Sequence, residues 1–93
     1  MAQRVAVIGA GPGGLVSARW LLSQGFEPTL FEQAPTLGGQ WTGLQGTSGV
    51  WPGMRTNTSR ILTAFSDLAH DDDRTFLPNE DVLDYLRRYA AMF

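Results

Sequence analysis

Residues 4–16 read RVAVIGAGPGGLV, an apolar run that passes directly into a cluster of glycines. The run is rich in valine and isoleucine and predicts a buried parallel strand over Arg4–Gly9. Gly9, Gly11 and Gly14 follow with the G-x-G-x-x-G spacing of a dinucleotide-binding turn. In such a turn the first glycine bends the chain, the second lets a pyrophosphate approach the backbone, and the third lets helix and strand pack closely. The helix that follows directs its free N–H groups at the phosphates.

The elements around this turn predict an α/β fold. Leucine and alanine at helical spacing predict a helix over Pro12–Gln24, and Gly25 stands where a left-handed stop is expected. Pro28–Glu32 then predicts a second strand, parallel to the first and joined to it by a right-handed crossover. We expect a Rossmann-like βαβ beginning of a doubly wound parallel sheet. Because a nucleotide-binding half of this kind needs at least a third strand, we expect residues 1–93 to be the N-terminal part of a larger domain.

The rest of the chain has one further clear periodicity. Residues 33–60 show none, and we expect a functional loop there, because structureless loops of that length are usually functional. Residues 61–67 predict a short helix or an extended piece, and residues 68–75 a polar surface turn. A last helix is expected to open at Asn79, a good N-cap residue. Its apolar face comprises Val82, Leu86, Tyr89 and Phe93.

Composition excludes several function classes. The 93 residues carry a net charge of −2, so nucleic acid is not an expected partner. The sequence has no cysteine, which excludes a disulfide scaffold and a zinc–cysteine site. No apolar run approaches the roughly 20 residues that span a bilayer, so we expect no membrane segment. The lack of cysteine and of targeting signals is compatible with a reducing cytoplasm, and we expect a cytoplasmic protein. His70 beside Asp71–Asp73 predicts a solvated loop, and no metal site is expected.

Glu32 stands where a dinucleotide-binding fold places its ribose-binding acid. It ends the second expected strand, 32 − 14 = 18 residues after Gly14, close to the usual spacing of about 20. A carboxylate there accepts hydrogen bonds from the ribose hydroxyls and repels a 2′-phosphate. The sequence therefore favours FAD or NAD over NADP on this turn. The alternative is a strand–helix turn with fortuitous glycines and a solvated Glu32.

Two polar and aromatic clusters follow in the long loop. Gly38-Gly39-Gln40-Trp41 combines paired glycines, which permit close backbone approach, with an indole that can wall off a flat ring. Thr56-Asn57-Thr58 offers short polar groups, and the Asn57 amide can fix a heteroaromatic edge or a peroxide oxygen. The alternatives are a surface turn with one packed tryptophan for the first cluster and a helix N-cap for the second.

Taken together, these motifs resemble the N-terminus of flavin-containing monooxygenases and the related Baeyer–Villiger monooxygenases. The resemblance rests on Gly9–Gly14, Phe31-Glu32, Gly38-Gly39-Gln40-Trp41, Thr56-Asn57-Thr58-Ser59-Arg60, Phe65-Ser66-Asp67 and Tyr85–Phe93. It implies a cofactor site for FAD made of Gly9, Gly11, Pro12, Gly13, Gly14, Glu32, Gly39, Gln40, Trp41, Thr56, Asn57 and Thr58. It also implies a catalytic role for Asn57, as a hydrogen-bonding stabiliser of the flavin or peroxide.

The resemblance further implies a reaction. FAD would be reduced by NADPH, O₂ would add at flavin C4a, and one oxygen atom would pass to a nitrogen or sulfur nucleophile or to a ketone. Trp51–Arg55 resembles the Y-P-G-x-R run of the Baeyer–Villiger branch, yet Asn57 stands where that branch carries aspartate. We therefore favour a small nitrogen or sulfur compound as the substrate. Most NADPH-binding residues are expected outside this segment, in the same polypeptide or a partner chain, so the segment alone should be inactive.

Three other interpretations of the sequence remain open. The first is an FAD oxidoreductase without oxygenase activity, which would not require the Trp41 and Asn57 segments. The second is an NAD-dependent dehydrogenase with NAD on the glycine turn. The third is a non-catalytic nucleotide-binding module, which would show no turnover with any reductant.

Overall fold

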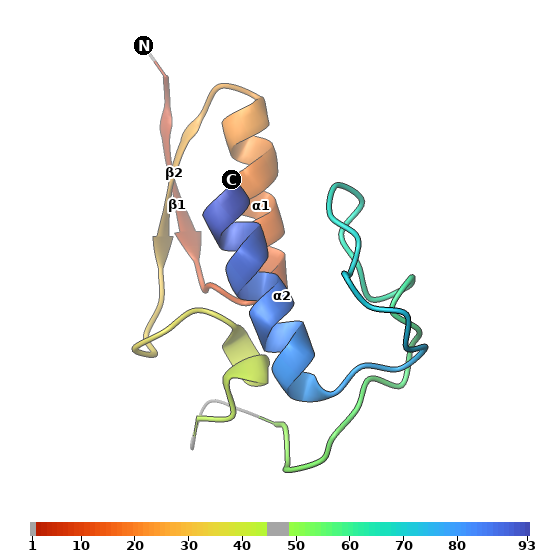
Figure 1. Cartoon of the computed structure of the whole chain (residues 1–93). Coiled ribbons are helices and arrows are strands. Elements are labelled where there is room, and N and C mark those ends of the chain that lie inside the picture. The colour runs from red at the N-terminus through yellow and green to blue at the C-terminus, as the bar shows by residue number, and fades with distance from the viewer. Residues whose placement is uncertain (1, 45–48) are drawn as a thin grey trace.

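The computed structural model describes residues 2–44 and 49–93 (Figure 1). Residues 45–48 of the long segment expected at 33–60 lie outside this description. Its elements follow the order β1 (Arg4–Ile8), α1 (Pro12–Ser23), β2 (Glu27–Phe31), the 3₁₀ helix η1 (Gly39–Thr42) and α2 (Asn79–Met92). Among the described residues, no helix is long and apolar enough to cross a membrane.

The two strands form the parallel pair that the sequence predicts. β1 and β2 pair in register from Arg4 opposite Glu27 to Ile8 opposite Phe31, and α1 forms the crossover between them. The chain leaves α1 through Gly25, whose φ of 84° is the left-handed conformation expected for the stop. The α/β, Rossmann-like beginning of the fold is therefore confirmed. β2 ends one residue before the expected end, which leaves Glu32 just beyond the strand.

The glycine turn brings α1 directly onto the end of β1. Gly9 has a φ of 100° and turns the chain, and its N–H donates to the Phe31 carbonyl at 2.7 Å. A Cβ atom at Gly14 would lie 1.9 Å from the Gly9 carbonyl oxygen. Glycine at this position is thus a packing requirement of the helix–strand contact.

Residues 49–78 form an irregular excursion beside α2, on the side away from the sheet (Figure 1). Residues 61–67 are wrongly predicted as a helix or an extended piece, because they form turns, and Phe65 makes an isolated antiparallel bridge with Leu68. The Tyr85 hydroxyl on α2 accepts the Phe65 N–H at 2.8 Å and donates to the Leu68 carbonyl. The shape of this segment therefore depends on its contacts to α2, since the segment has no periodicity of its own.

The start of α2 differs from the prediction. Pro78 occupies the N-cap position, and no side chain caps the helix there, so the expectation of Asn79 as N-cap is wrong. The physical reason is that residues 77–79 pair with an earlier segment: Pro78 bridges to Arg55, and the Asn79 N–H donates to the Met54 carbonyl at 3.0 Å. The helix therefore begins at Asn79, the last residue of this pairing, and Pro78 is left at the N-cap position.

The core lies between the two helices. Its buried members are Leu15 from α1 and Tyr85, Leu86 and Tyr89 from α2. Val82, Leu86 and Tyr89 are buried as the periodicity predicts, whereas Phe93 keeps 42% of its surface exposed. The outer part of the sheet is less covered, since Ile8 is 81% exposed and Phe31 is 55% exposed.

The Asp67 carboxylate connects the excursion to both helices, through an ion pair to α1 and a hydrogen bond to α2. Arg19 of α1 binds the Asp67 carboxylate at 2.9 Å, and the Tyr89 hydroxyl donates to the same oxygen at 3.3 Å. Burial and this bond to Asp67 raise the pKa of Tyr89 to about 12, so the hydroxyl keeps its proton as a donor. The second Asp67 oxygen is buried without a partner among the described residues.

Gly14→Ala tests the helix–strand contact. The added methyl would meet a backbone carbonyl that cannot move aside, so we expect the unfolding free energy to fall by more than about 3 kcal/mol, or folding to fail. Gly13→Ala is the matched control, because its Cβ would meet nothing within 4 Å. The control should change stability by no more than about 1 kcal/mol. Chemical denaturation of the natural-length protein measures both, and equal effects would contradict the packing role of Gly14.

Candidate functional site

The glycine turn presents open backbone at the start of α1. Gly11 has an extended conformation at the N-cap, and Pro12 follows in the first turn, where its missing N–H has no cost. A Cβ at Gly13 would meet nothing within 4 Å, so the backbone there is accessible to a ligand. The first N–H groups of a helix lack intrahelical acceptors and carry the positive end of its dipole. This turn therefore fits a phosphate group.

Glu32 lies against the glycine turn. One oxygen of its carboxylate accepts the Ala10 N–H at 2.8 Å, and the other accepts the Ala34 N–H at 2.9 Å. The hydrogen bond from Ala34, followed by that from Ala10, lowers the pKa of Glu32 below its usual 4.5, so the group is ionised near neutral pH. An ionised acid at the carboxyl ends of two parallel strands fits the hydroxyls of a ribose.

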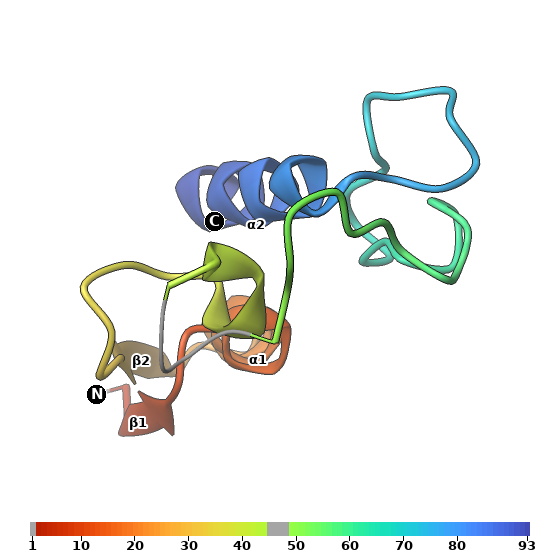
Figure 2. The ribbon, with the colours of Figure 1, turned by 90° about the horizontal axis from the view of Figure 1, so that it is seen from below.

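The second glycine pair packs on the first turn. The Gly38 N–H donates to the Ala10 carbonyl at 2.8 Å, and a Cβ at Gly39 would lie 3.0 Å from the Gly11 Cα. Both glycines have positive φ. Figure 2 shows the result, with η1 lying between the start of α1 and α2. The contact brings Gln40 and Trp41 next to the glycine turn.

A cavity of about 400 Å³ continues from η1. It brings together the two loop clusters that the sequence singles out, although they are separated along the chain. Its lining residues are Gln40, Trp41, Trp51, Met54, Arg55, Thr56, Asn57, Thr58 and Thr63. The glycine turn and Glu32 do not line this cavity. The candidate site thus has two parts, which the packing of Gly39 on Gly11 joins end to end.

Four of these lining residues were not among the predicted site residues. Trp51, Met54 and Arg55 lie in the loop without periodicity, and Thr63 lies in the segment that follows it. The signals that could have indicated them are their closeness in sequence to Asn57 and the resemblance of residues 51–55 to the Y-P-G-x-R run. Among the described residues, Arg55 is the one charged group that lines the cavity. Trp51 is 63% exposed and adds a second indole beside Trp41.

The three central residues of the second cluster have different environments. Thr56 is buried, and its hydroxyl donates to the Thr58 carbonyl at 2.8 Å. The Thr58 hydroxyl lies 2.5 Å from the Thr63 hydroxyl. Asn57 is exposed, and the structure contains no hydrogen-bond partner for its amide among the described residues. Of the three side chains, Asn57 is the one whose hydrogen-bonding groups are available to a ligand.

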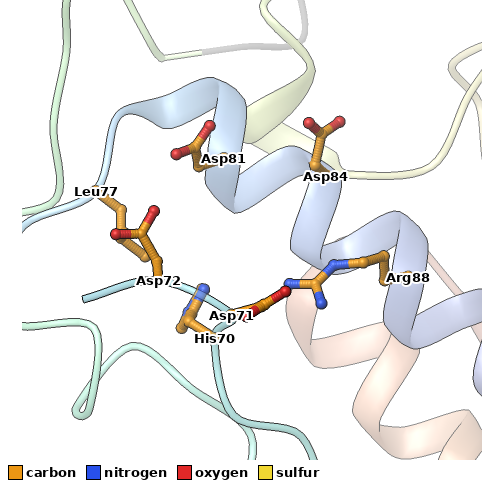
Figure 3. A pocket seen from close by; sticks show the side chains of 7 residues that line it. All are labelled: His70, Asp71, Asp72, Leu77, Asp81, Asp84 and Arg88. Atoms are coloured by element: carbon orange, nitrogen blue, oxygen red, sulfur yellow. The ribbon is translucent and has the colours of Figure 1, made fainter. Parts of the chain in front are cut away.

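A second, acidic cavity of about 290 Å³ lies between α2 and the segment that holds His70, Asp71 and Asp72 (Figure 3). His70 does not offer its ring to a ligand there, because Nε2 lies 2.8 Å from the Thr63 carbonyl and the ring stacks on Tyr85. The Asp72 carboxylate binds Arg74 at 2.5 Å, and this pairing holds the pKa of Asp72 well below its usual range. Among the described residues, no group of three or more His, Cys, Asp or Glu could hold a metal ion.

The comparisons with known proteins all lead to monooxygenases or oxygenases. A family model described as flavin-binding monooxygenase-like matches residues 2–93. The chain is 39% identical over 98 residues to the N-oxide-forming dimethylaniline monooxygenase 2 of Cavia porcellus and to the flavin-containing monooxygenase 2 of Homo sapiens. In each case the match covers 100% of this chain and 18% of the relative.

Solved structures give the same result. The S-allyl-L-cysteine S-oxygenase of Allium sativum matches with a TM-score of 0.88 and 31% identity, over 99% of this chain and 26% of that one. A steroid monooxygenase bound to NADP matches with a TM-score of 0.81 and 26% identity, over 100% of this chain and 18% of that one.

Glu32→Gln tests the ionised state of the acid. Because its pKa is lowered on folding, ionised Glu32 stabilises the protein above pH 4.5, and this contribution is lost as the pH falls through the lowered pKa. The difference in unfolding free energy between the parent protein and Glu32→Gln should therefore be constant above pH 4.5 and shrink below it. Urea unfolding between about pH 3 and pH 7 measures this difference. A difference that does not change with pH would contradict the assignment.

Proposed function

This chain belongs to the flavin-binding monooxygenase-like family, and from this premise we propose that it is the N-terminal part of the FAD-binding domain of an NADPH- and O₂-dependent monooxygenase. The single observation that carries the proposal is the end-to-end arrangement of the glycine turn, η1 and the cavity around Asn57. This arrangement suits a long dinucleotide better than a mononucleotide, because both of its ends find matching groups. The chain spans about a fifth of the relatives it matches, so the activity belongs to the natural-length protein.

FAD would bind with its pyrophosphate at the start of α1. Gly13 leaves the backbone open there, because a Cβ at this position would meet nothing within 4 Å, and the helix N-terminus favours the negative charge. Each Glu32 oxygen already accepts one N–H and has a further lone pair for a ribose hydroxyl. The observed hydrogen bonds hold the carboxylate in place before the ribose arrives.

The flavin end would lie in the cavity beside η1. Bound FAD would take electrons from NADPH and activate O₂ for transfer of one oxygen atom to the substrate. This chain's residues would position and shield it: Trp41 and Trp51 as aromatic walls that exclude water, and Asn57 as a hydrogen-bonding group. Thr58, Gly39 and Gln40 belong to the same proposed site, and Thr56 lies in the wall of the cavity beside Asn57. Most of the NADPH site would come from residues outside this segment.

We place the substrate among small compounds with a nitrogen or sulfur nucleophile. The names of two relatives support this class, one being N-oxide-forming and the other an S-oxygenase. A ketone is the alternative, because the steroid and cyclohexanone monooxygenases match the fold as well. The exposed Ile8 and Phe31 side chains support a sheet that further strands complete, in the same polypeptide or a partner chain.

Glu32→Ala tests the FAD site. In the natural-length protein we expect visible flavin absorption, and the substitution should weaken FAD binding roughly tenfold or more, since a hydrogen bond to a charged group contributes about 1.5–3 kcal/mol. Glu27→Ala is the matched control, because Glu27 is exposed at the opposite end of β2. FAD titration followed by fluorescence measures both variants. A colourless protein that binds NAD instead of FAD would favour a dehydrogenase, and unchanged FAD affinity in Glu32→Ala would remove the ribose from this position.

Asn57→Ala tests the oxygenation role. Loss of one preorganised hydrogen-bonding group in a reaction site costs about 100-fold in rate, and we expect a loss of this size in oxygenated product. FAD content should change little. Ser66→Ala, an exposed polar residue in the same excursion, is the control and should keep full activity. Product formation and NADPH consumption are measured together. If the Asn57 variant oxygenates as well as the parent protein, Asn57 has no part in the chemistry.

A further inference from the structure

Thr56 makes a two-point connection to Leu77, which lies two residues before α2. Its N–H donates to the Leu77 carbonyl at 2.8 Å, and its hydroxyl oxygen accepts the Leu77 N–H at 3.1 Å. Both residues are inside the protein, with Thr56 at 7% exposure and Leu77 at 0%. Both backbone polar groups of Leu77 are therefore bonded to the same residue, one to the backbone of Thr56 and the other to its side chain.

The same hydroxyl closes the turn around Asn57. Its proton is used in the bond to the Thr58 carbonyl at 2.8 Å, on the far side of Asn57. A hydroxyl has one proton to donate, and here that proton is committed to the backbone. The hydroxyl oxygen of Thr56 thus links Thr58, the residue after Asn57, to Leu77, which lies two residues before α2.

The side chain between these connections is the exposed one. Asn57 lines the cavity, and its amide has no partner among the described residues. An exposed asparagine in an irregular loop samples many conformations unless its backbone is held. The hydrogen bonds of Thr56 supply that restraint.

We propose that Thr56 is a positioning residue, which holds the Asn57 amide toward the cavity and does not itself contact the cofactor. The proposal rests on the role of Asn57 in the proposed function. A direct contact between the Thr56 hydroxyl and a flavin acceptor would first have to break its bond to Thr58. Thr56 lines the cavity with only 7% of its surface exposed, which leaves little of its side chain for such a contact.

A double-mutant cycle in the natural-length, FAD-loaded enzyme tests the proposal. Thr56→Val keeps the shape of the side chain and removes the hydroxyl, Thr56→Ser keeps the hydroxyl, and each is combined with Asn57→Ala. Thr75→Val is the control, an exposed threonine given the same substitution. The readouts are oxygenated product per NADPH consumed, the visible flavin spectrum and the thermal unfolding midpoint.

The expected result is a difference between backgrounds. Thr56→Val should lower the product per NADPH roughly tenfold when Asn57 is present, because a small misplacement of a reacting group costs this much or more. In the Asn57→Ala background the same substitution should cause no further loss. Thr56→Ser and Thr75→Val should keep the parent ratio, and FAD content should be unchanged throughout.

The following results would overturn the proposal. An equal loss from Thr56→Val in both backgrounds would mean that Thr56 acts on the cofactor or the fold directly. If Thr56→Val forms as much product per NADPH as the parent enzyme while Asn57→Ala remains defective, the positioning role is overturned and the proposed function stands. An active Asn57→Ala enzyme would overturn both. If Thr56→Val does not fold, Thr56→Ser decides, because a loss as large as that of Asn57→Ala despite the retained hydroxyl contradicts the proposal.

Discussion

At Gly14 the first helix lies so close to the Gly9 carbonyl that no side chain fits between them. This contact determines where α1 starts, and therefore which backbone N–H groups face the ends of the strands. A similarly close backbone contact occurs between Gly39 and Gly11, where a second segment packs on the turn. Two glycine contacts in series thus carry the chain from the sheet to the cavity beside η1. Larger residues at these positions would separate the two halves of the candidate site.

The sequence predicts well what depends on neighbours in the chain. The parallel strands, the crossover helix and the buried face of α2 follow from local periodicity, and the structure has all of them. The place of Glu32 follows from strand length and spacing, because the end of β2 must lie beside the end of β1. A short pattern with a fixed geometry is enough in each case.

What the sequence does not predict depends on contacts between distant residues. The Asn79 N–H bonds to the Met54 carbonyl, and Pro78 takes the N-cap position in place of Asn79. No pattern in the residues around Asn79 predicts this pairing. The turns at 61–67 are held by groups from the two helices, the Tyr85 hydroxyl and the Arg19 guanidinium. Trp51 and Arg55 also line the cavity, and the composition of the loop indicates a functional segment without identifying these residues as part of the cavity wall.

The Tyr85 hydroxyl makes the excursion and α2 one cooperative unit. It satisfies the Phe65 N–H and the Leu68 carbonyl from the buried face of the helix, so neither backbone group can meet solvent while the helix stays in place. Local opening in proteins proceeds in such units, each with its own free energy. Amide hydrogen exchange at Phe65 would then follow the opening of α2, although Phe65 lies in a segment with no helix or strand. An irregular loop can in this way acquire the lifetime of the helix that it touches.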